Sequence, residues 1–184
     1  MAAIHLVLLS GGIDSACLLA DCTAKHRDVE TLFIDYGQAP AMKERECSSA
    51  LAAERNVPWS AVRLTGLSIS AGEIPGRNAL LVHIAFAHLG AIETSCIYLG
   101  IHAGTPYRDC TPDFIKETQK ALDYLGGGTR QLVAPFVSWS KGEVHQRAKE
   151  LGVPIELTHS CERSADPCGA CPSCVDRRAL VASS

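Results

Sequence analysis

Six residues near the start of the sequence, Ser10 to Ser15, have the types and spacing needed to hold a phosphate group. They read Ser-Gly-Gly-Ile-Asp-Ser. The glycines let the backbone approach an oxygen closely, the serines add hydroxyl donors, and Asp14 is able to cap a helix or help hold Mg²⁺. The pattern is neither the Gly-x-x-x-x-Gly-Lys-Ser/Thr phosphate loop nor the Gly-x-Gly-x-x-Gly dinucleotide loop. The alternative is an ordinary turn between two elements that happens to use small residues.

A second group of residues suited to chemistry lies near the end of the sequence. It consists of four cysteines spaced Cys-x6-Cys-x2-Cys-x2-Cys: Cys161, Cys168, Cys171 and Cys174. Four thiolates complete a closed tetrahedral shell, so we expect a structural ion, with Zn²⁺ favoured over an iron–sulfur cluster or no metal. His159 is an outside candidate for a ligand, but a surface or pocket position is the expectation. Cys110 is a candidate nucleophile, although a buried and inert cysteine is commoner.

The phosphate-type residues lie where a strand is predicted to turn into a helix. An apolar segment, Ile4 to Leu9, has the branching of a buried strand, and Ile13 to Cys22 is apolar without a helix breaker. Unpaired backbone N–H groups and the positive end of the helix meet at such a junction. The junction is therefore a ready anion site.

The rest of the chain alternates between predicted strands and helices. Further strands are expected at 30–36, 59–64, 95–101 and 131–136, and helices at 40–55, 77–91, 112–125 and 140–151, with loops at 65–76 and 100–111. Pro112 marks one helix start, and Ser140 with Glu143 forms a capping box at another. This alternation predicts an α/β fold with a Rossmann-like parallel sheet of about five strands and helices on both faces. We expect one nucleotide-binding domain over 1–157 and a small metal-binding segment over 158–184, packed on the same domain.

Composition limits the classes of partner. The 184 residues carry a formal charge of −3 and a sequence pI of about 6.1, which argues against a general nucleic-acid or acidic-membrane surface. No apolar run approaches the roughly 18 residues of a membrane span. The first predicted strand leaves no room for a signal peptide, so the chain is expected to be cytoplasmic, where nine cysteines suggest metal rather than disulfides.

Ser-Gly-Gly-x-Asp-Ser resembles the pyrophosphate (PP) loop of the N-type ATP pyrophosphatases. Over nearly its whole length the chain resembles one group of them, the 7-cyano-7-deazaguanine synthases. The first and last of the matching segments are specific, and the middle ones mean little singly. These segments are residues 9–15, 35–38, 75–78, 109–114, 134–135, 140–143, 157–161 and 167–171.

The resemblance implies a C–N bond-forming ligase with a HUP-type fold that uses ATP twice. The carboxylate of 7-carboxy-7-deazaguanine is adenylated, ammonia gives the amide, and a second adenylation allows dehydration to the nitrile, preQ0. AMP and pyrophosphate leave each time, with Mg²⁺ present. The resemblance further implies a zinc ion on the four cysteines, a homodimer, and a place in queuosine biosynthesis.

Residue roles follow as hypotheses from the same resemblance and from the charge of the leaving pyrophosphate. Ser10, Asp14 and Ser15 hold the phosphates, and Arg77 and Lys141 share their charge unless they are solvated surface residues. The expected ATP contacts come from the loop and the second strand: Leu8, Leu9, Ser10, Gly11, Gly12, Ile13, Asp14, Ser15, Ala16, Phe33 and Tyr36. Phe33 could equally belong to the core. The expected substrate contacts are Arg77, Asn78, Tyr107, which could stack, and Asp109, whose carboxylate suits two parallel N–H donors.

The chain departs from the family pattern near the acceptor. The loop at 66–75 is shorter than expected, residues 102–108 replace a longer loop that usually begins with Asn, and His159 stands where Trp is usual. Three alternatives stay open: a diverged ligase that adenylates another acid or uses another amine, a sulfur-transfer enzyme, and a zinc-containing binding module without turnover.

Overall fold

The computed structural model describes residues 3–66, 74–90 and 95–182. Its centre is a parallel sheet of five strands in the order β3-β2-β1-β4-β5. The strands, in chain order, are β1 (Ile4–Leu8), β2 (Val29–Asp35), β3 (Trp59–Arg63), β4 (Ser95–Tyr98) and β5 (Arg130–Val133). This arrangement confirms the predicted Rossmann-like sheet.

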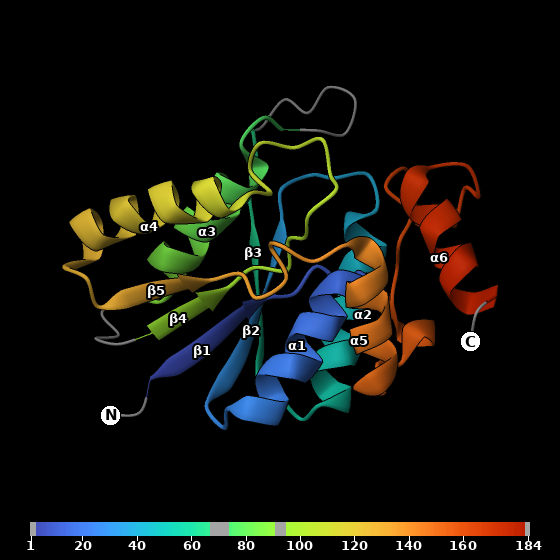
Figure 1. Cartoon of the computed structure of the whole chain (residues 1–184), viewed down its shortest axis with the longest axis horizontal. Coiled ribbons are helices and arrows are strands. Elements are labelled where there is room, and N and C mark those ends of the chain that lie inside the picture. The colour runs from blue at the N-terminus through green and yellow to red at the C-terminus, as the bar shows by residue number, and fades with distance from the viewer. Residues whose placement is uncertain (1–2, 67–73, 91–94, 183–184) are drawn as a thin grey trace.

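Helices cover both faces of the sheet (Figure 1). On one face lie α1 (Ile13–Lys25), α2 (Ala41–Glu54) and α5 (Lys141–Glu150), and on the other lie α3 (Arg77–His88) and α4 (Pro112–Gly126). The central strand serves both faces because successive side chains alternate: Val7 packs toward α1, and Leu6 and Leu8 pack toward α3. All three are buried, so the second half of the strand is apolar on both faces.

The order of the strands creates a crevice between the carboxyl ends of β1 and β4. The chain winds from β1 through β2 to β3, then crosses back to place β4 and β5 on the other side of β1. Ligands in open α/β sheets bind at such a switch point. Here the chain that leaves β4 passes close to α1, because a Cβ at Gly100 would lie 3.4 Å from the carbonyl oxygen of Asp14.

Two predicted helix starts are confirmed by their hydrogen bonds. The hydroxyl of Thr111 accepts from the N–H of Phe114 at 3.2 Å, one residue before Pro112 opens α4. At α5 the hydroxyl of Ser140 accepts from the N–H of Glu143, whose carboxylate accepts the N–H of Ser140 at 2.7 Å. These side chains satisfy donors that would otherwise be unpaired at the helix starts.

Some element bounds differ from the sequence predictions. β4 ends at Tyr98 and β5 at Val133, three residues earlier than predicted for both, because the chain then turns toward the crevice. α3 ends at His88, and its predicted end at Ala91 lies outside the described residues.

The C-terminal segment contains two elements that the sequence analysis did not predict. They are η1 (Ile155–Leu157), a short 3₁₀ helix, and α6 (Pro172–Ala182). Leu180 of α6 is buried in the same core cluster as Val7 and Val144. Burial of Leu180 anchors α6 to the core of the molecule, and no local sequence pattern predicts this contact.

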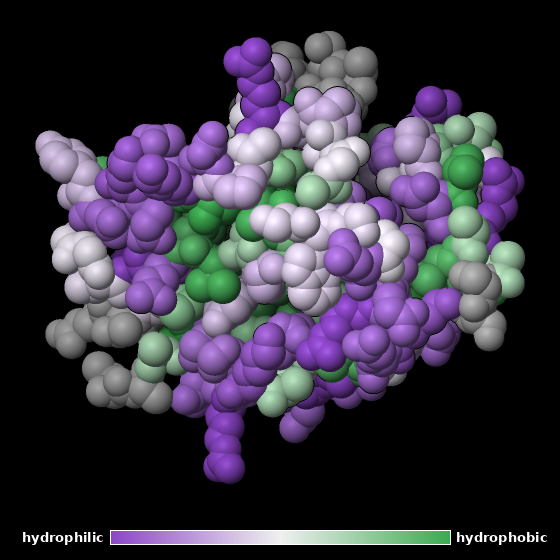
Figure 2. Space-filling view, in the orientation of Figure 1, coloured by the Kyte–Doolittle hydropathy of each residue, from purple (hydrophilic) through white to green (hydrophobic). Residues whose placement is uncertain are grey.

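The surface is mostly hydrophilic in the view of Figure 2. Hydrophilic residues cover the outward side of α4 and the lower part of α1 and α5, and a hydrophobic area lies between α4 and β5. Among the described helices, none is both long enough and apolar enough to cross a lipid bilayer.

Candidate active site

The loop from β1 to α1 turns at two glycines. Gly11 has φ +84°, and a Cβ there would lie 2.6 Å from the carbonyl oxygen of Glu44 in α2. Gly12 is the N-cap of α1, and its carbonyl accepts from the N–H of Ala16 at 2.9 Å. The N–H groups of residues 13–15 therefore have no acceptor within the helix. They are free to bind an anion at the positive end of α1.

Two hydroxyl groups lie beside these N–H groups. The Oγ of Ser10 donates to the Oγ of Ser15 at 3.1 Å, and the Oγ of Ser15 donates to the carbonyl of Gly12 at 3.0 Å. Ser10 is exposed, whereas Ser15 is buried at the start of α1. The loop thus presents hydroxyl and amide groups to the same anion site.

Asp14 faces two basic side chains. Nζ of Lys141 donates to Oδ2 of Asp14 at 2.5 Å, and Nε2 of His102 lies 3.8 Å from the same oxygen. Nδ1 of His102 is 2.7 Å from the carbonyl of Ala103, to which it donates its proton, so Nε2 carries the lone pair when the ring is neutral. Oδ1 of Asp14 is buried and has no hydrogen-bond partner in the described chain. An unpartnered carboxylate oxygen beside a phosphate-type loop fits a hard cation such as Mg²⁺.

A cavity of about 240 Å³ opens beside this loop, at the carboxyl ends of β1, β2 and β4. This volume is below the roughly 300–1,000 Å³ of pockets that enclose whole ligands, so the enclosed part has room for only a portion of a drug-sized molecule. The lining residues are Leu8, Leu9, Ser10, Gly12, Asp14, Ser15, Leu32, Ile34, Tyr36, Gln38, Glu44, Arg77, Asn78, Leu81, Leu99, Gly100 and Ile101.

Arg77 and Glu44 supply charges of opposite sign inside the cavity. Burial acts to lower the pKa of Arg77, but the adjacent Tyr36 phenol and Asp109 raise it, and the net shift is upward. Burial raises the pKa of Glu44, although a hydrogen bond from Gln38 at 2.8 Å and the charge of Arg77 oppose the shift. The guanidinium therefore stays charged, and it is placed to bind an anion inside the cavity.

Three predicted substrate contacts occupy different positions. Asn78 lines the cavity, and Asp109 holds it there: Oδ2 of Asp109 accepts the N–H of Asn78 and its carbonyl accepts from Nδ2, both at 3.0 Å. Asp109 thus stabilises the start of α3. Neither Asp109 nor Tyr107, which is 41% exposed, is among the described residues that line the cavity. Their contacts with substrate stay predictions.

The structure does not bring every predicted ATP contact to the cavity. Phe33 is 1% exposed and lies on the opposite side of β2 from Leu32, Ile34 and Tyr36, because side chains alternate along a strand. Phe33 is therefore a core residue that does not line the cavity, whereas its neighbours Leu32 and Ile34 do. Ile13 and Ala16 point into the core as well.

The four C-terminal cysteines lie together, and their sulfur atoms are all within 4.8 Å of one another. Backbone N–H groups point at two of these sulfurs, from Cys168 to Cys161 at 3.5 Å and from Cys171 to Cys168 at 3.4 Å. Burial acts against ionisation of Cys161, yet hydrogen bonds from Ser164 and from backbone N–H groups lower its pKa to about 5. A thiolate already favoured by the protein fits a zinc ion held by all four residues.

His159 connects the cysteine segment to the phosphate-type loop. It is 7% exposed, not a surface residue, and its N–H donates to the carbonyl of Gly11 at 2.9 Å. Its Nε2 lies 3.1 Å from the carbonyl of Cys161 and 3.0 Å from that of Ser164. His159 thus connects the four-cysteine segment to the phosphate-type loop. It does not belong to the group of described residues that could hold the metal ion with the four cysteines.

Cys110 lies behind the cavity wall. It is 9% exposed, and Nδ2 of Asn78 donates to its sulfur at 3.4 Å. Burial raises the pKa of the thiol, which disfavours the thiolate that a nucleophile needs. The geometry favours the inert cysteine over the sulfur carrier.

Comparison with known proteins decides the family. The model described as "Queuosine biosynthesis protein QueC" matches residues 4–73 and 67–183. The chain belongs to the QueC family. Its relatives include 7-cyano-7-deazaguanine synthases from Aquifex aeolicus, 33% identical over 94% of this chain and 93% of the relative, and from Methanoculleus marisnigri, 36% identical over 93% and 90%.

Solved structures agree on the fold of this QueC-family chain. A U34-tRNA thiolase, NcsA from Methanococcus maripaludis, has a TM-score of 0.55 at 14% identity, covering 100% of this chain and 66% of that one. An NH3-dependent NAD synthetase from Campylobacter jejuni has a TM-score of 0.55 at 18% identity, covering 84% and 66%. At these identities the likeness concerns the fold alone.

The family match also bears on the loop at 66–75, which is shorter than the family resemblance led us to expect. The two matched ranges overlap at residues 67–73 of that loop, and these seven residues lie outside the described part of the chain. The alignment with the Aquifex relative runs over 205 residues, more than the 184 of this chain. The relative therefore carries residues that this QueC-family member lacks.

Sequence reasoning missed several residues of the cavity. Gln38 belongs to a segment that matched the family but was given no role, and Glu44 lies within a helix whose pattern gave no hint that one acid points inward. Leu99, Gly100 and Ile101 follow β4 and become part of the site only because β4 pairs with β1. Alternation along β2 could have identified Leu32 and Ile34.

Proposed function

We propose that the protein is a 7-cyano-7-deazaguanine synthase, which converts 7-carboxy-7-deazaguanine and ammonia to preQ0 with ATP. The observation that carries the proposal is the similarity to proteins of that name along more than nine tenths of the chain. In the first half-reaction the acid oxygen attacks the α-phosphate, pyrophosphate leaves, and ammonia then displaces AMP to give the amide. In the second, adenylation of the amide oxygen and loss of AMP give the nitrile.

The geometry of the loop supports the ATP half of the proposal. Ser10, Ser15 and the N–H groups at the start of α1 would hold the β- and γ-phosphates. Pyrophosphate leaves with several negative charges, which Lys141, paired with Asp14 of the loop, and Arg77, which lines the cavity, would share. Mg²⁺, if bound at Oδ1 of Asp14, would supply further positive charge.

The residues proposed to bind the deazaguanine acid are those of the cavity outside the phosphate-type loop. Deazaguanine presents N–H donors that a carboxylate accepts in parallel. We assign this contact to Glu44, because it lines the cavity, in addition to the predicted Asp109, and each carboxylate already accepts one hydrogen bond, from Gln38 and from Asn78 respectively. Arg77 faces the same space and suits the carboxylate of the acid before it is activated.

Three further properties follow the family resemblance. We propose a structural zinc ion on the four cysteines, supported by the convergence of their sulfur atoms. We also propose that the chain works as a cytoplasmic homodimer with free ammonia as its nitrogen donor. Sedimentation of the purified protein tests the dimer, and replacing ammonium by glutamine as the only nitrogen source tests the donor.

The reaction is tested by mass spectrometry of the products formed from ATP, Mg²⁺, ammonium and 7-carboxy-7-deazaguanine. The expected result is the nitrile, with two AMP for each acid consumed. AMP with an amide alone, or with neither product, would replace the proposal by the diverged ligase, the second candidate, which is favoured by the residues that this chain lacks relative to the Aquifex protein. ADP in place of AMP would overturn both.

A further inference from the structure

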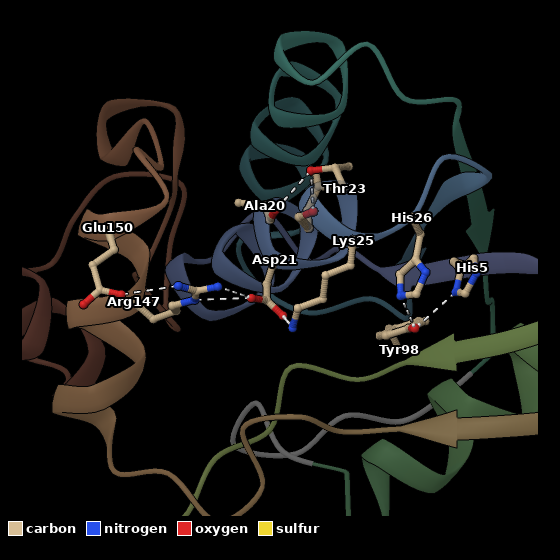
Figure 3. Close-up of polar contacts among 10 residues, drawn as sticks. His5, Ala20, Asp21, Thr23, Lys25, His26, Tyr98, Arg147 and Glu150 are labelled. Atoms are coloured by element: carbon tan, nitrogen blue, oxygen red, sulfur yellow. Dashed lines mark hydrogen bonds and ion pairs between the residues drawn. The ribbon is translucent and has the colours of Figure 1, made fainter.

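A cluster of histidine, cysteine and tyrosine lies at the opposite end of the sheet from the cavity. His5 is near the start of β1, whose other end carries the phosphate-type loop. Tyr98 is the last residue of β4, and its side chain extends back toward the start of β1, so that its hydroxyl reaches His5. Cys22 and His26 are one helical turn apart at the end of α1. Figure 3 shows His5 and His26 side by side, with Tyr98 facing both.

The side chains of this cluster converge on one point. The rings of His5 and His26 stack with centroids 3.7 Å apart and planes 15° from parallel. The hydroxyl of Tyr98 lies 3.1 Å from Nδ1 of His5 and 3.1 Å from Nε2 of His26. The sulfur of Cys22 and one nitrogen of each histidine all lie within 4.8 Å of one another. Three potential ligand atoms thus surround a position beside a phenol oxygen.

Burial gives the cluster a closed side and an open side. Cys22 is 2% exposed and Tyr98 is 8% exposed, whereas both histidines are half-buried. An ion could enter past the imidazole rings, while the thiol stays shielded from bulk water. None of these residues contributes to the phosphate-type loop, the cavity or the four-cysteine group.

Two imidazoles and a thiolate form a donor set that suits Zn²⁺. With Zn–N of about 2.0–2.1 Å and Zn–S of about 2.3 Å, tetrahedral ligand atoms lie about 3.3–3.6 Å apart. The described atoms, which lie within 4.8 Å of one another, therefore need to approach by at most about 1.2–1.5 Å. A metal also lies in the plane of each imidazole it binds, so the two rings would turn out of their stack.

We propose that His5, Cys22 and His26 form a second zinc site in this protein, with Tyr98 beside the fourth position. Cys22 releases its thiol proton to solvent as the zinc–sulfur bond forms, and the histidines bind as neutral imidazoles. The site joins the end of α1 to the start of β1, and it is independent of the proposed function.

The test uses the whole purified protein with its four-cysteine site loaded. Excess Co²⁺ is added and removed by gel filtration, and total metal per chain is measured together with the visible absorption of four-coordinate cobalt. We expect two metal ions per chain, a thiolate-to-cobalt band, and a higher thermal unfolding midpoint than before the addition. Exchange of cobalt into the four-cysteine site would leave the total at one, and that total would overturn the proposal.

Variants separate the second site from the first. His26→Gln and Cys22→Ser are each expected to hold one metal ion per chain and to lose the thermal shift. His88→Gln is the matched control, because His88 also lies at the end of a helix but outside the cluster, and it should hold two. Two ions in His26→Gln would contradict the assignment. His26 is half-buried, so this variant serves if Cys22→Ser fails to fold.

Discussion

At the scale of single residues, the contact between Asp14 and Lys141 joins segments 127 positions apart in the chain. Lys141 is the first residue of α5, where the positive end of the helix disfavours a cation. Its position is stabilised by the carboxylate 2.5 Å away and would be stabilised further by a bound polyphosphate. Asp14 therefore holds the Lys141 ammonium group in a position where it is able to bind an anion.

The first prediction concerns that lysine. Lys141→Met should slow AMP formation about 10²-fold, the usual effect of removing one group that stabilises developing charge. Lys120→Met is the matched control, because Lys120 also pairs with an acid, Glu117, at 2.7 Å but lies on the exposed side of α4. Single-turnover assays with ATP and the acid compare the two. An equal rate in both variants would remove Lys141 from the chemistry.

The second prediction separates backbone strain from close packing at Gly11. Gly11 and Gly104 both have φ +84°, but a Cβ at Gly104 would meet nothing within 4 Å. Gly104→Ala should lower the free energy of unfolding by about 1–2 kcal/mol, the cost of the left-handed conformation. Gly11→Ala should cost more and also abolish AMP formation, because α2 would have to move. Urea titrations measure the free energy of unfolding of both variants, and an equal decrease in the two would contradict the packing argument.

At the scale of elements, α1 connects the phosphate-type loop to the cluster of His5, Cys22 and His26. Its N-terminus forms the anion site and its C-terminus carries Cys22 and His26. Between them Asp21, which is 5% exposed, accepts from Nη2 of Arg147 at 2.7 Å and from Lys25 (Figure 3). This contact holds α1 against α5, the helix that begins at Lys141.

The third prediction uses the pH dependence of that contact. Burial acts to raise the pKa of Asp21, but the hydrogen bonds and charges of Lys25 and Arg147 lower it below its usual value. The stabilisation is therefore present above the unfolded pKa of about 3.9 and is lost as pH falls through the lower folded value. Asp21→Asn should cost about 1–2 kcal/mol at pH 7, and the difference from the wild type should shrink below about pH 4.

Urea titrations at several pH values measure this difference. Asp123→Asn is the control, since Asp123 accepts a hydrogen bond from Gln119 on the exposed side of α4. This substitution should change the free energy of unfolding little at any of these pH values. A cost for Asp21→Asn that does not change with pH would show that shape, and not charge, makes the contact.

At the scale of the whole molecule, the C-terminal segment packs against the phosphate-type loop. His159 links Gly11 to Cys161, Arg177 of α6 donates to the carbonyl of Ile155 at 2.7 Å, and Leu180 enters the main core. The predicted boundary between residues 157 and 158 stays a prediction. Any ion bound by the cysteines would act on the loop through this packing.

The fourth prediction is that loss of zinc weakens nucleotide binding. Cys171→Ser should lower the zinc content and raise the dissociation constant for ATP at least about tenfold, because the N–H of His159 no longer holds the Gly11 carbonyl. Cys96→Ser, which alters a half-buried cysteine outside both metal groups, should change neither quantity. Metal analysis and calorimetry measure them. Normal ATP affinity without zinc would uncouple the segment from the loop.

Several features were determined by the sequence itself because they depend on neighbours along the chain. The phosphate-type loop, the cysteine spacing, the capping box at Ser140 and the alternation of strands with helices are all local patterns, and the structure confirms that the loop joins a strand to a helix and that the cysteines converge. Local hydrogen bonding and periodic burial produce these features wherever the segment is placed.

Only the tertiary structure decided which distant residues meet. The pairing of β1 with β4 brings Gly100 to the loop, the packing of α2 turns Glu44 into the cavity, and the alternation of β2 turns Phe33 away from it. The same is true of His159 at Gly11 and of His5 with Cys22 and His26. Contacts between distant segments depend on strand order and packing, which no pattern of neighbouring residues carries, whereas the alternation along β2 is local and only the face that borders the cavity had to come from the fold.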